Sequence, residues 1–236
     1  MTDIAVVRIA NPSAPRGAAP DLAWVGADDP AVLVTDLGVN RGDGIFEVAG
    51  SVDGRVHALD AHLARLAQSA AMLDLPLPNA AIVATAIRQV VDAVAPRHLG
   101  RELLVKVIYT RGQEVGDTDL SPTGWALAWP AGDHAQGRAG INVITLDRGV
   151  RSDVTRTSPW LLAGAKTLSY AANKAALREA HRRGADDVLF ISSDAHALEG
   201  PSSSLIADID GVWVTPPASE GVLAGTTQAD AFAWAS

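Results

Sequence analysis

The sequence predicts an α/β (α+β) fold in two domains, and three features of its pattern indicate this. In the first 130 residues, short apolar runs typical of strands flank two stretches whose apolar residues repeat at helical spacing. A polar, glycine-rich stretch over residues 132–140 is typical of a linker. A second series of short apolar runs follows, with an alanine-rich helical stretch among them. We therefore expect a small N-terminal α/β domain at 1–130, a linker at 131–140 and a second domain at 141–236.

The N-terminal domain is expected to hold five strands, each built from a short apolar run. Runs of this length, bounded by turn-forming residues, favour strands. A stretch rich in Pro, Ala and Gly over residues 11–20 predicts a loop after the first strand. The expected strands cover residues 4–9, 31–35, 45–49, 103–110 and 125–129.

Two amphipathic helices are expected between the third and fourth of these strands. From 59 to 73, leucine and alanine recur at steps of four and three, which places them on one helix face, and Asp60 is the expected N-cap. Pro76 and Pro78 end this helix. Asn79 is the expected cap of a second helix, which carries an apolar face as far as Val94.

The second domain is expected to combine short strands with two helices. Strands are predicted over 141–146, 188–191, 205–209 and 212–215, with Asp210-Gly211 as the hairpin turn between the last two. A helix is predicted over 169–183, and Gly184 follows it where a left-handed residue is expected. A last helix begins near Thr226-Thr227 and reaches the end of the chain after about two or three turns. We therefore expect this domain to be the start of a larger one, with its C-terminal part missing from the sequence.

The composition excludes several classes of protein. Lys and Arg number 19 against 27 Asp and Glu, and a net charge of −8 argues against binding to a nucleic-acid backbone. The chain has no Cys, which excludes a disulfide scaffold, a thiolate metal site and a Cys nucleophile. The six His residues show no metal-ligand spacing, so we expect no metal site. No apolar run reaches the ~18–20 residues of a membrane span, and the N-terminus lacks a signal-peptide pattern, so we expect a cytoplasmic protein with no membrane partner.

Lys166 is the strongest candidate for amine chemistry. Only three of the 19 basic residues are lysines, and Lys166 follows an apolar stretch and precedes a helix. Partial desolvation favours the neutral amine and makes it a better nucleophile. The alternative is a loop lysine that extends into water. A phosphate-binding P-loop is excluded, because Ala165 and Trp160 stand where that motif requires glycine.

Three further positions carry suitable chemistry, each with an ordinary alternative. Glu199 lies in a loop of small and hydroxyl residues, where it could pair with a cationic ring nitrogen or simply face water. Thr226 and Thr227 follow Gly225 at the start of the last helix, where they could bind a phosphate or only cap the helix. Arg65 shares a helix face with His62 and could clamp a phosphate or lie in solvent.

Taken in order, these segments resemble the class-IV aminotransferase family of pyridoxal-phosphate (PLP) enzymes. That family includes branched-chain aminotransferases, D-amino-acid aminotransferases and 4-amino-4-deoxychorismate lyases. The resemblance extends from about residue 36 to residue 227. The matching motifs are Arg41-Gly42-Asp43-Gly44-Ile45-Phe46-Glu47, His62-Leu63-Ala64-Arg65-Leu66, Lys166-Thr167-Leu168-Ser169-Tyr170, Gly184-Ala185-Asp186-Asp187, Glu199-Gly200 and Gly225-Thr226-Thr227.

The resemblance implies a fold and a set of roles. The fold is fold type IV, with a small N-terminal α/β domain, a larger C-terminal domain and PLP in the cleft. Lys166 would hold PLP as a Schiff base and shuttle protons, and Glu199 would keep the pyridine nitrogen protonated. Arg65, Thr226 and Thr227 would bind the phosphate, and Tyr170 would approach the phenolic oxygen of PLP. The resemblance also implies a homodimer.

The branch of the family is indicated by the segment after Lys166, which is similar to the lyase and D-amino-acid branches. Two positions depart from them. Gly116 stands where a second arginine often binds the substrate carboxylate, and Val48 follows Phe-Glu where lyases often have Thr. Arg41, Arg111 and Arg156 are the candidates to replace that arginine.

The leading hypothesis is a PLP-dependent lyase that converts 4-amino-4-deoxychorismate to 4-aminobenzoate and pyruvate, a step of folate synthesis. The alternative is an aminotransferase for D-amino acids or branched-chain amino acids with a 2-oxo acid acceptor. A third hypothesis is a non-catalytic relative that keeps only the fold.

Overall fold

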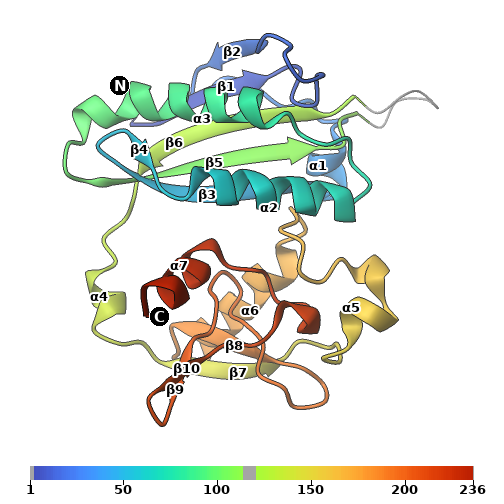
Figure 1. The fold of residues 1–236 in the computed structure, drawn as a ribbon, viewed down its shortest axis with the longest axis vertical. Helices are drawn as coiled ribbons and strands as arrows, with labels where there is room; N and C mark the ends of the chain where they lie inside the picture. The colour runs from blue at the N-terminus through green and yellow to red at the C-terminus, as the bar shows by residue number, and fades with distance from the viewer. Residues whose placement is uncertain (1–2, 114–120, 236) are drawn as a thin grey trace. The chain divides into compact units, whose positions relative to one another are not determined.

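The computed structural model describes residues 3–113 and 121–235 (Figure 1). The chain forms two compact units. The first contains the chain up to Gly132 together with Lys166–Ser169, and the second contains Asp133–Ala165 and everything from Tyr170 onward. Lys166–Ser169 therefore belongs to the first unit, although it follows that unit by more than thirty residues in the sequence.

A six-stranded antiparallel sheet forms the first unit. The strand order is β2-β1-β6-β5-β3-β4, so the long strands β3 and β5 pair near its centre. The strands are β1 (Ala5–Ile9), β2 (Leu22–Val25), β3 (Gly44–Val52), β4 (Arg55–Val56), β5 (Glu102–Thr110) and β6 (Thr123–Pro130).

Two helices cover one face of this sheet, α2 (Leu59–Met72) and α3 (Ala80–Val94) (Figure 1). The alternation of β3 sends Ile45, Glu47 and Ala49 to the buried face, where α2 packs. Asn79 caps α3 as predicted, and its side chain accepts hydrogen bonds from the first-turn amides at 3.0 and 3.3 Å. A short helix α1 (Leu37–Asn40) and a 3-10 turn η1 (Ala95–Arg97) complete the described helices of this unit.

Two local predictions for this unit are wrong, and one edge strand was not predicted. The run at 31–35 is not a strand; Val34 is 78% exposed, and the run leads into the Asp36 cap of α1. An apolar run becomes a strand only when a neighbouring strand pairs with it, and β1 pairs with β2 instead, an edge strand that the pattern did not reveal. The N-cap of α2 is Ala58 in the left-handed region, which leaves Asp60 inside the first turn.

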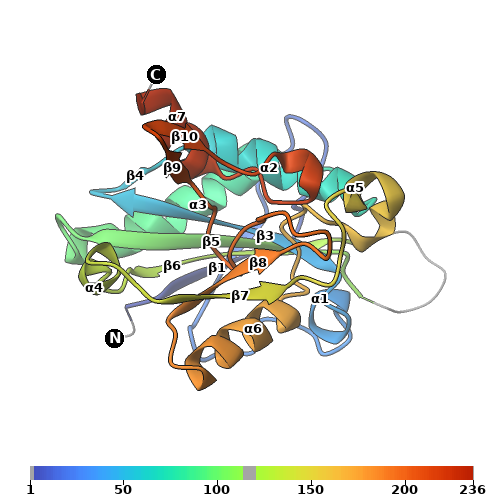
Figure 2. The same cartoon turned by 90° about the horizontal axis from the view of Figure 1, so that it is seen from below.

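The second unit is built around a parallel pair, β7 (Val143–Asp147) and β8 (Asp187–Ile191), with α6 (Ala171–Arg182) packed against both strands (Figure 2). A small core joins Ala180 of α6, Phe190 of β8 and the loop residues Leu198 and Val222. Gly184 follows α6 with a φ of 77°, as predicted.

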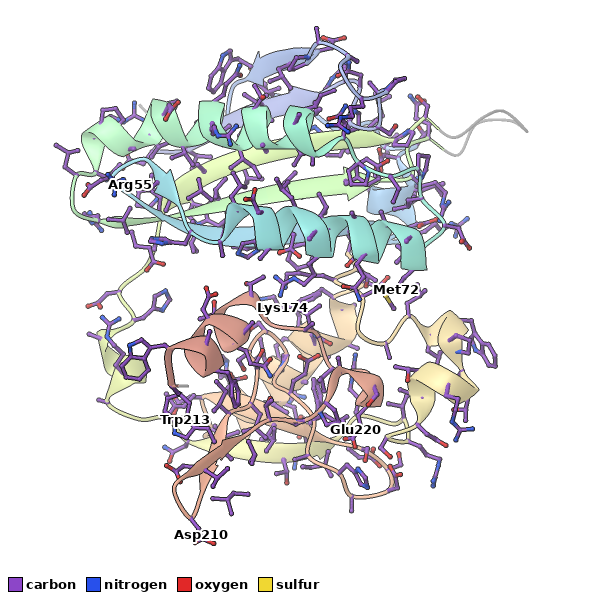
Figure 3. All side chains as sticks on the ribbon, in the orientation of Figure 1. Arg55, Met72, Lys174, Asp210, Trp213 and Glu220 are labelled. Carbon is purple, nitrogen blue, oxygen red and sulfur yellow. The ribbon has the colours of Figure 1, made fainter. Side chains whose placement is uncertain are left out.

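The remaining elements of this unit are short. The hairpin of β9 (Ala207–Ile209) and β10 (Val212–Val214) turns at Asp210 and Gly211, both with positive φ, and Figure 3 labels Asp210 at its tip. The other helices are α4 (Ala135–Arg138), which lies within the stretch expected to be a linker, α5 (Val154–Thr157), η2 (Pro159–Leu161), η3 (Ala218–Glu220) and α7 (Thr226–Ala235). Across the described residues, every helix is too short or too polar to cross a membrane.

Candidate active site

Lys166 is held against β3 of the first unit. Its backbone N–H donates to Ser69 Oγ at 3.1 Å, and its carbonyl accepts from the Phe46 N–H at 3.0 Å. The next residues continue this attachment, since Thr167 bridges to Ile45 and the Leu168 N–H donates to the Gly44 carbonyl at 2.8 Å. The Lys166 ammonium lies 4.6 Å from the centre of the Phe46 ring. The partly buried lysine therefore has a backbone fixed by a strand and a side chain that contacts an aromatic face.

Arg65 takes part in a buried group with Glu47 and His62. Arg65 Nε and Nη2 donate to the two carboxylate oxygens of Glu47, both at 2.7 Å, and His62 Nδ1 lies 2.8 Å from Glu47 Oε2. All three side chains are at most one-tenth exposed. Burial raises the pKa of Glu47, but the hydrogen bonds and charges of Arg65 and His62 outweigh it, so the pKa falls below its ordinary value of 4.5. Glu47 remains ionised and fixes the plane of the guanidinium.

The sequence analysis included Glu47 in a family motif and assigned it no role. The signal that could have revealed it is the period-two pattern of β3, which sends Glu47 to the apolar face beside Ile45 and Ala49. A carboxylate on a buried face needs a cationic partner. The shared helix face of His62 and Arg65 supplies that partner.

Arg111 has a structural position in the first unit. Its Nε lies 2.6 Å from Asp43 Oδ2, and its Nη2 donates to Asp43 Oδ1 at 3.3 Å and to the Leu73 carbonyl at 2.6 Å. Its Nη1 lies 3.4 Å from the Asp74 carbonyl. These bonds tie the C-terminal end of α2 to the turn before β3. These structural contacts differ from the predicted role of Arg111 at the substrate carboxylate.

The other candidates for that carboxylate lie in different surroundings. Arg41 is exposed at the C-cap of α1. Arg156, in the second unit, pairs with Asp153 at 3.1 Å. Gly116, the position that lacks the expected arginine, lies outside the described residues.

In the second unit, a backbone amide orients Glu199. The Leu223 N–H lies 3.1 Å from both carboxylate oxygens, and the Glu199 carbonyl accepts from the Phe190 N–H at 3.0 Å. The prediction that placed Glu199 in a loop between two apolar strands is therefore correct in outline.

Tyr170 lies within electrostatic reach of Glu199. Burial raises the pKa of Tyr170, the negative charge of Glu199 raises it further, and the Asn173 hydrogen bond and the Arg148 charge oppose them. Asn173 in turn donates to the Pro201 carbonyl at 2.7 Å, in the loop that follows Glu199. The structure thus brings Tyr170 and Glu199 together within one unit.

Thr226 and Thr227 begin α7, as the sequence predicted. The amides of a first helical turn lack intrahelical acceptors and carry the positive end of the helix dipole. The approach to this turn is tight, because a Cβ at Gly225 would lie 2.5 Å from Ser204 Oγ. Gln228 Nε2 donates to Thr215 Oγ1 at 2.6 Å and ties the same turn to the end of the hairpin.

The sequence model of the family described as amino-transferase class IV matches residues 44–236. The chain belongs to the class IV aminotransferase family. The chain is similar to a fold IV transaminase from Curtobacterium pusillum, with 50% sequence identity and a TM-score of 0.93. The similarity covers 99% of this chain and 78% of that structure.

Two further similarities are to proteins of Mycobacterium tuberculosis. A bifunctional aminodeoxychorismate lyase / D-amino acid transaminase is 40% identical over 86% of this chain and 72% of its own length. The PLP-bound form of a hypothetical aminotransferase is 39% identical, with a TM-score of 0.84, over 89% of this chain and 74% of that structure. The predicted family, fold type, enzyme class and cofactor are confirmed: this is a PLP-dependent class IV enzyme.

The groups present in this class IV chain fit PLP chemically. An amine for the aldehyde is available on Lys166, a carboxylate for the pyridine nitrogen on Glu199, and a guanidinium for the phosphate on Arg65. The amides at the start of α7 are a second phosphate-binding feature. Among the described residues, no group of three His, Asp or Glu side chains is arranged to hold a metal ion.

Proposed function

We propose that this chain is a transaminase for small D-amino acids, with PLP as its cofactor and a 2-oxo acid as acceptor. The main support is the 50% identity with a fold IV transaminase over nearly the whole chain. The relative that is 40% identical carries a D-amino acid transaminase activity in its name. The segment Lys166-Thr167-Leu168-Ser169-Tyr170 also resembles that branch in spacing.

The chain's own residues have distinct tasks in this proposal. When bound, PLP supplies an electron-withdrawing ring that acidifies the substrate Cα–H. Lys166 Nζ would hold the cofactor through its aldehyde, and once a substrate amine has displaced it, the free Nζ would take the substrate Cα proton and return it. Glu199 would accept a hydrogen bond from the protonated pyridine nitrogen.

Phosphate binding and ring orientation fall to the remaining residues. Arg65, whose guanidinium is held by Glu47, would donate to the phosphate, and the first amides of α7 at Thr226 and Thr227 would be further phosphate donors. The raised pKa of Tyr170 keeps its hydroxyl protonated at neutral pH, so it would be available to donate to the phenolic oxygen of the cofactor.

Arg41 is proposed as the group that binds the substrate carboxylate. Arg111 is less suited, because its three guanidinium nitrogens already contact Asp43 and two carbonyls of the α2 end. Replacing Arg41 with Gln should raise KM for the amino donor.

The lyase reaction is a second candidate, supported by the bifunctional name of the 40% identical relative. In that reaction Lys166 Nζ would remove a ring proton from 4-amino-4-deoxychorismate and deliver a proton to the methylene carbon of the enolpyruvyl group, whose C–O bond to the ring breaks, so that pyruvate leaves and the ring becomes aromatic. No 2-oxo acid acceptor is consumed. The two reactions therefore differ in what must be added to the assay.

The test begins with the absorbance of the purified protein before and after PLP addition. Wild type should gain a visible band that Lys166→Ala lacks, and Lys174→Ala, which changes an exposed lysine on α6, should keep it. A D-amino acid alone should then bleach the band of wild type, and a 2-oxo acid should restore it. Pyruvate release from aminodeoxychorismate without an acceptor would support the lyase instead. A protein with no visible band in excess PLP would contradict both and favour the non-catalytic relative.

We further propose that the enzyme acts as a homodimer in the cytoplasm on its small-molecule amine substrate. Family members act on small amines, and the dimer follows from the resemblance alone. Light scattering after size exclusion should give twice the mass of one chain, and a monomer mass would refute the dimer.

A further inference from the structure

Two segments of the second unit run side by side and are joined by two contacts in register. His196 Nδ1 lies 3.0 Å from Glu220 Oε1. Three residues further along both segments, the Leu223 N–H donates to the Glu199 carboxylate. We propose that the His196–Glu220 pair is a pH-dependent clamp that positions Glu199 by holding the 218–225 segment in register with the 192–199 hairpin. This inference rests on the proposed role of Glu199 toward PLP.

The first segment is a rigid return hairpin after β8. The Ser192 N–H donates to the His196 carbonyl at 2.8 Å, and the His196 N–H donates to Ser192 Oγ at 2.9 Å. Leu198 and Glu199 then exchange backbone hydrogen bonds with Phe190 at 2.9 and 3.0 Å. His196 and Glu199 therefore belong to one hydrogen-bonded hairpin, so the position of His196 is fixed relative to that of Glu199.

The second segment has fewer attachments of its own. The Ser219 carbonyl accepts from Thr155 Oγ1 at 2.6 Å, and Val222 is buried in the core beside Leu198. Gly221 has a φ of 82° and ends the single turn of η3. Glu220, labelled in Figure 3, is the residue directly before Gly221. Its contact with His196 therefore helps to fix the path of the backbone from η3 to Leu223.

The charges around His196 favour its protonated form. The hydrogen bond and charge of Glu220 raise the pKa of His196 above 6.5, the charge of Asp194 adds to this, and partial burial and Arg151 oppose it. Because the folded pKa is raised, the contribution of the pair is complete below 6.5 and is lost as pH rises through the higher folded value. The clamp is therefore fully closed below pH 6.5 and weakens as pH rises through the folded pKa of His196.

The consequence concerns the cofactor. The amide of Leu223 orients Glu199, so a looser 218–225 segment lets the carboxylate rotate away from the pyridine nitrogen. The same segment leads through Gly225 into the first turn of α7, at Thr226. Loss of the His196–Glu220 contact should thus raise the dissociation constant of PLP while changing the melting temperature of the protein without PLP only slightly.

The experiment measures the dissociation constant of PLP by absorbance titration between pH 6 and pH 9. His196→Ala and Glu220→Gln remove the pair, and His196→Arg keeps a cation that does not titrate in this range. His181→Ala is the matched control, because it removes an exposed histidine from α6 of the same unit. The melting temperature of each protein without PLP is measured in parallel.

We expect His196→Ala and Glu220→Gln to weaken PLP binding about threefold near pH 6, as an exposed ion pair allows, and to approach wild type near pH 9. His196→Arg should restore affinity across the range, and His181→Ala should match wild type throughout. Equal PLP affinity of wild type and His196→Ala at pH 6 overturns the clamp while leaving the proposed function intact, and so does a loss that does not change with pH. A wild-type protein that binds no PLP overturns the proposed function itself.

Discussion

Replacing Glu47 with Gln should destabilise the first unit strongly, although the side chain keeps its size. Gln retains one oxygen acceptor but loses the negative charge between Arg65 and His62. In the native protein, Arg65 donates two hydrogen bonds of 2.7 Å to the Glu47 carboxylate oxygens. In the variant, the Gln N–H group would replace one of these acceptors and would face a donor. The guanidinium would remain buried without its counter-ion.

The expected size of the effect follows from the burial of these groups. Glu47 is 2% exposed and Arg65 is 9% exposed, so water cannot replace the lost partner. Breaking a buried ion pair from one side costs about 3–5 kcal/mol, and the acceptor that Gln retains places the expectation near ~3 kcal/mol. That loss reduces the ratio of folded to unfolded protein by more than ~100-fold.

The effect should also depend on pH with a definite sign. The folded pKa of Glu47 is lowered below 4.5, so its stabilisation is complete above 4.5 and is lost as pH falls through the folded value. The difference between wild type and Glu47→Gln should therefore shrink as pH falls below 4.5 and through the folded pKa of Glu47.

Urea unfolding of the protein without PLP, followed by fluorescence and circular dichroism, measures this difference. Glu102→Gln is the matched control, since it neutralises an exposed glutamate at the start of β5 in the same sheet and should change stability by less than ~0.5 kcal/mol. A loss below ~1 kcal/mol for Glu47→Gln would refute the reasoning, because that is the range of an exposed pair. A difference that grows below pH 4.5 would contradict the assigned pKa direction.

Three further predictions concern the frame of the site, and urea unfolding measures each of them. Asn79→Ala should cost about 1 kcal/mol by removing the cap of α3, and an unchanged midpoint would contradict the cap. Arg111→Gln should lower the free energy of unfolding by about 1–2 kcal/mol, because it breaks the hydrogen bonds to Asp43 and to the end of α2. A variant with unchanged stability and an altered KM would instead support a role for Arg111 in substrate binding. Gly221→Ala should cost at least ~1 kcal/mol, because φ is 82° and the new Cβ would lie 2.8 Å from that of Ala163; a neutral result would show that the turn relaxes.

The sequence alone determined the family, the two amphipathic helices and the Asn79 cap, and it predicted Lys166 as the reactive lysine. These features depend on residues close together in the chain: helical spacing, a capping side chain, and short motifs in a fixed order. Local patterns of this kind can be recognised without knowledge of the fold, because they reflect interactions between residues within one or two helical turns.

Only the tertiary structure decided which of these residues act together within each unit. Lys166 joins β3 through contacts across more than one hundred residues of chain, and Glu47 meets Arg65 because strand alternation and helix phase bring them to one interface. Long-range pairing also placed β2 beside β1, whereas the 31–35 run has no strand partner in the described sheet. Such pairings depend on which partner buries more apolar surface and satisfies more backbone groups, a competition that no local pattern records.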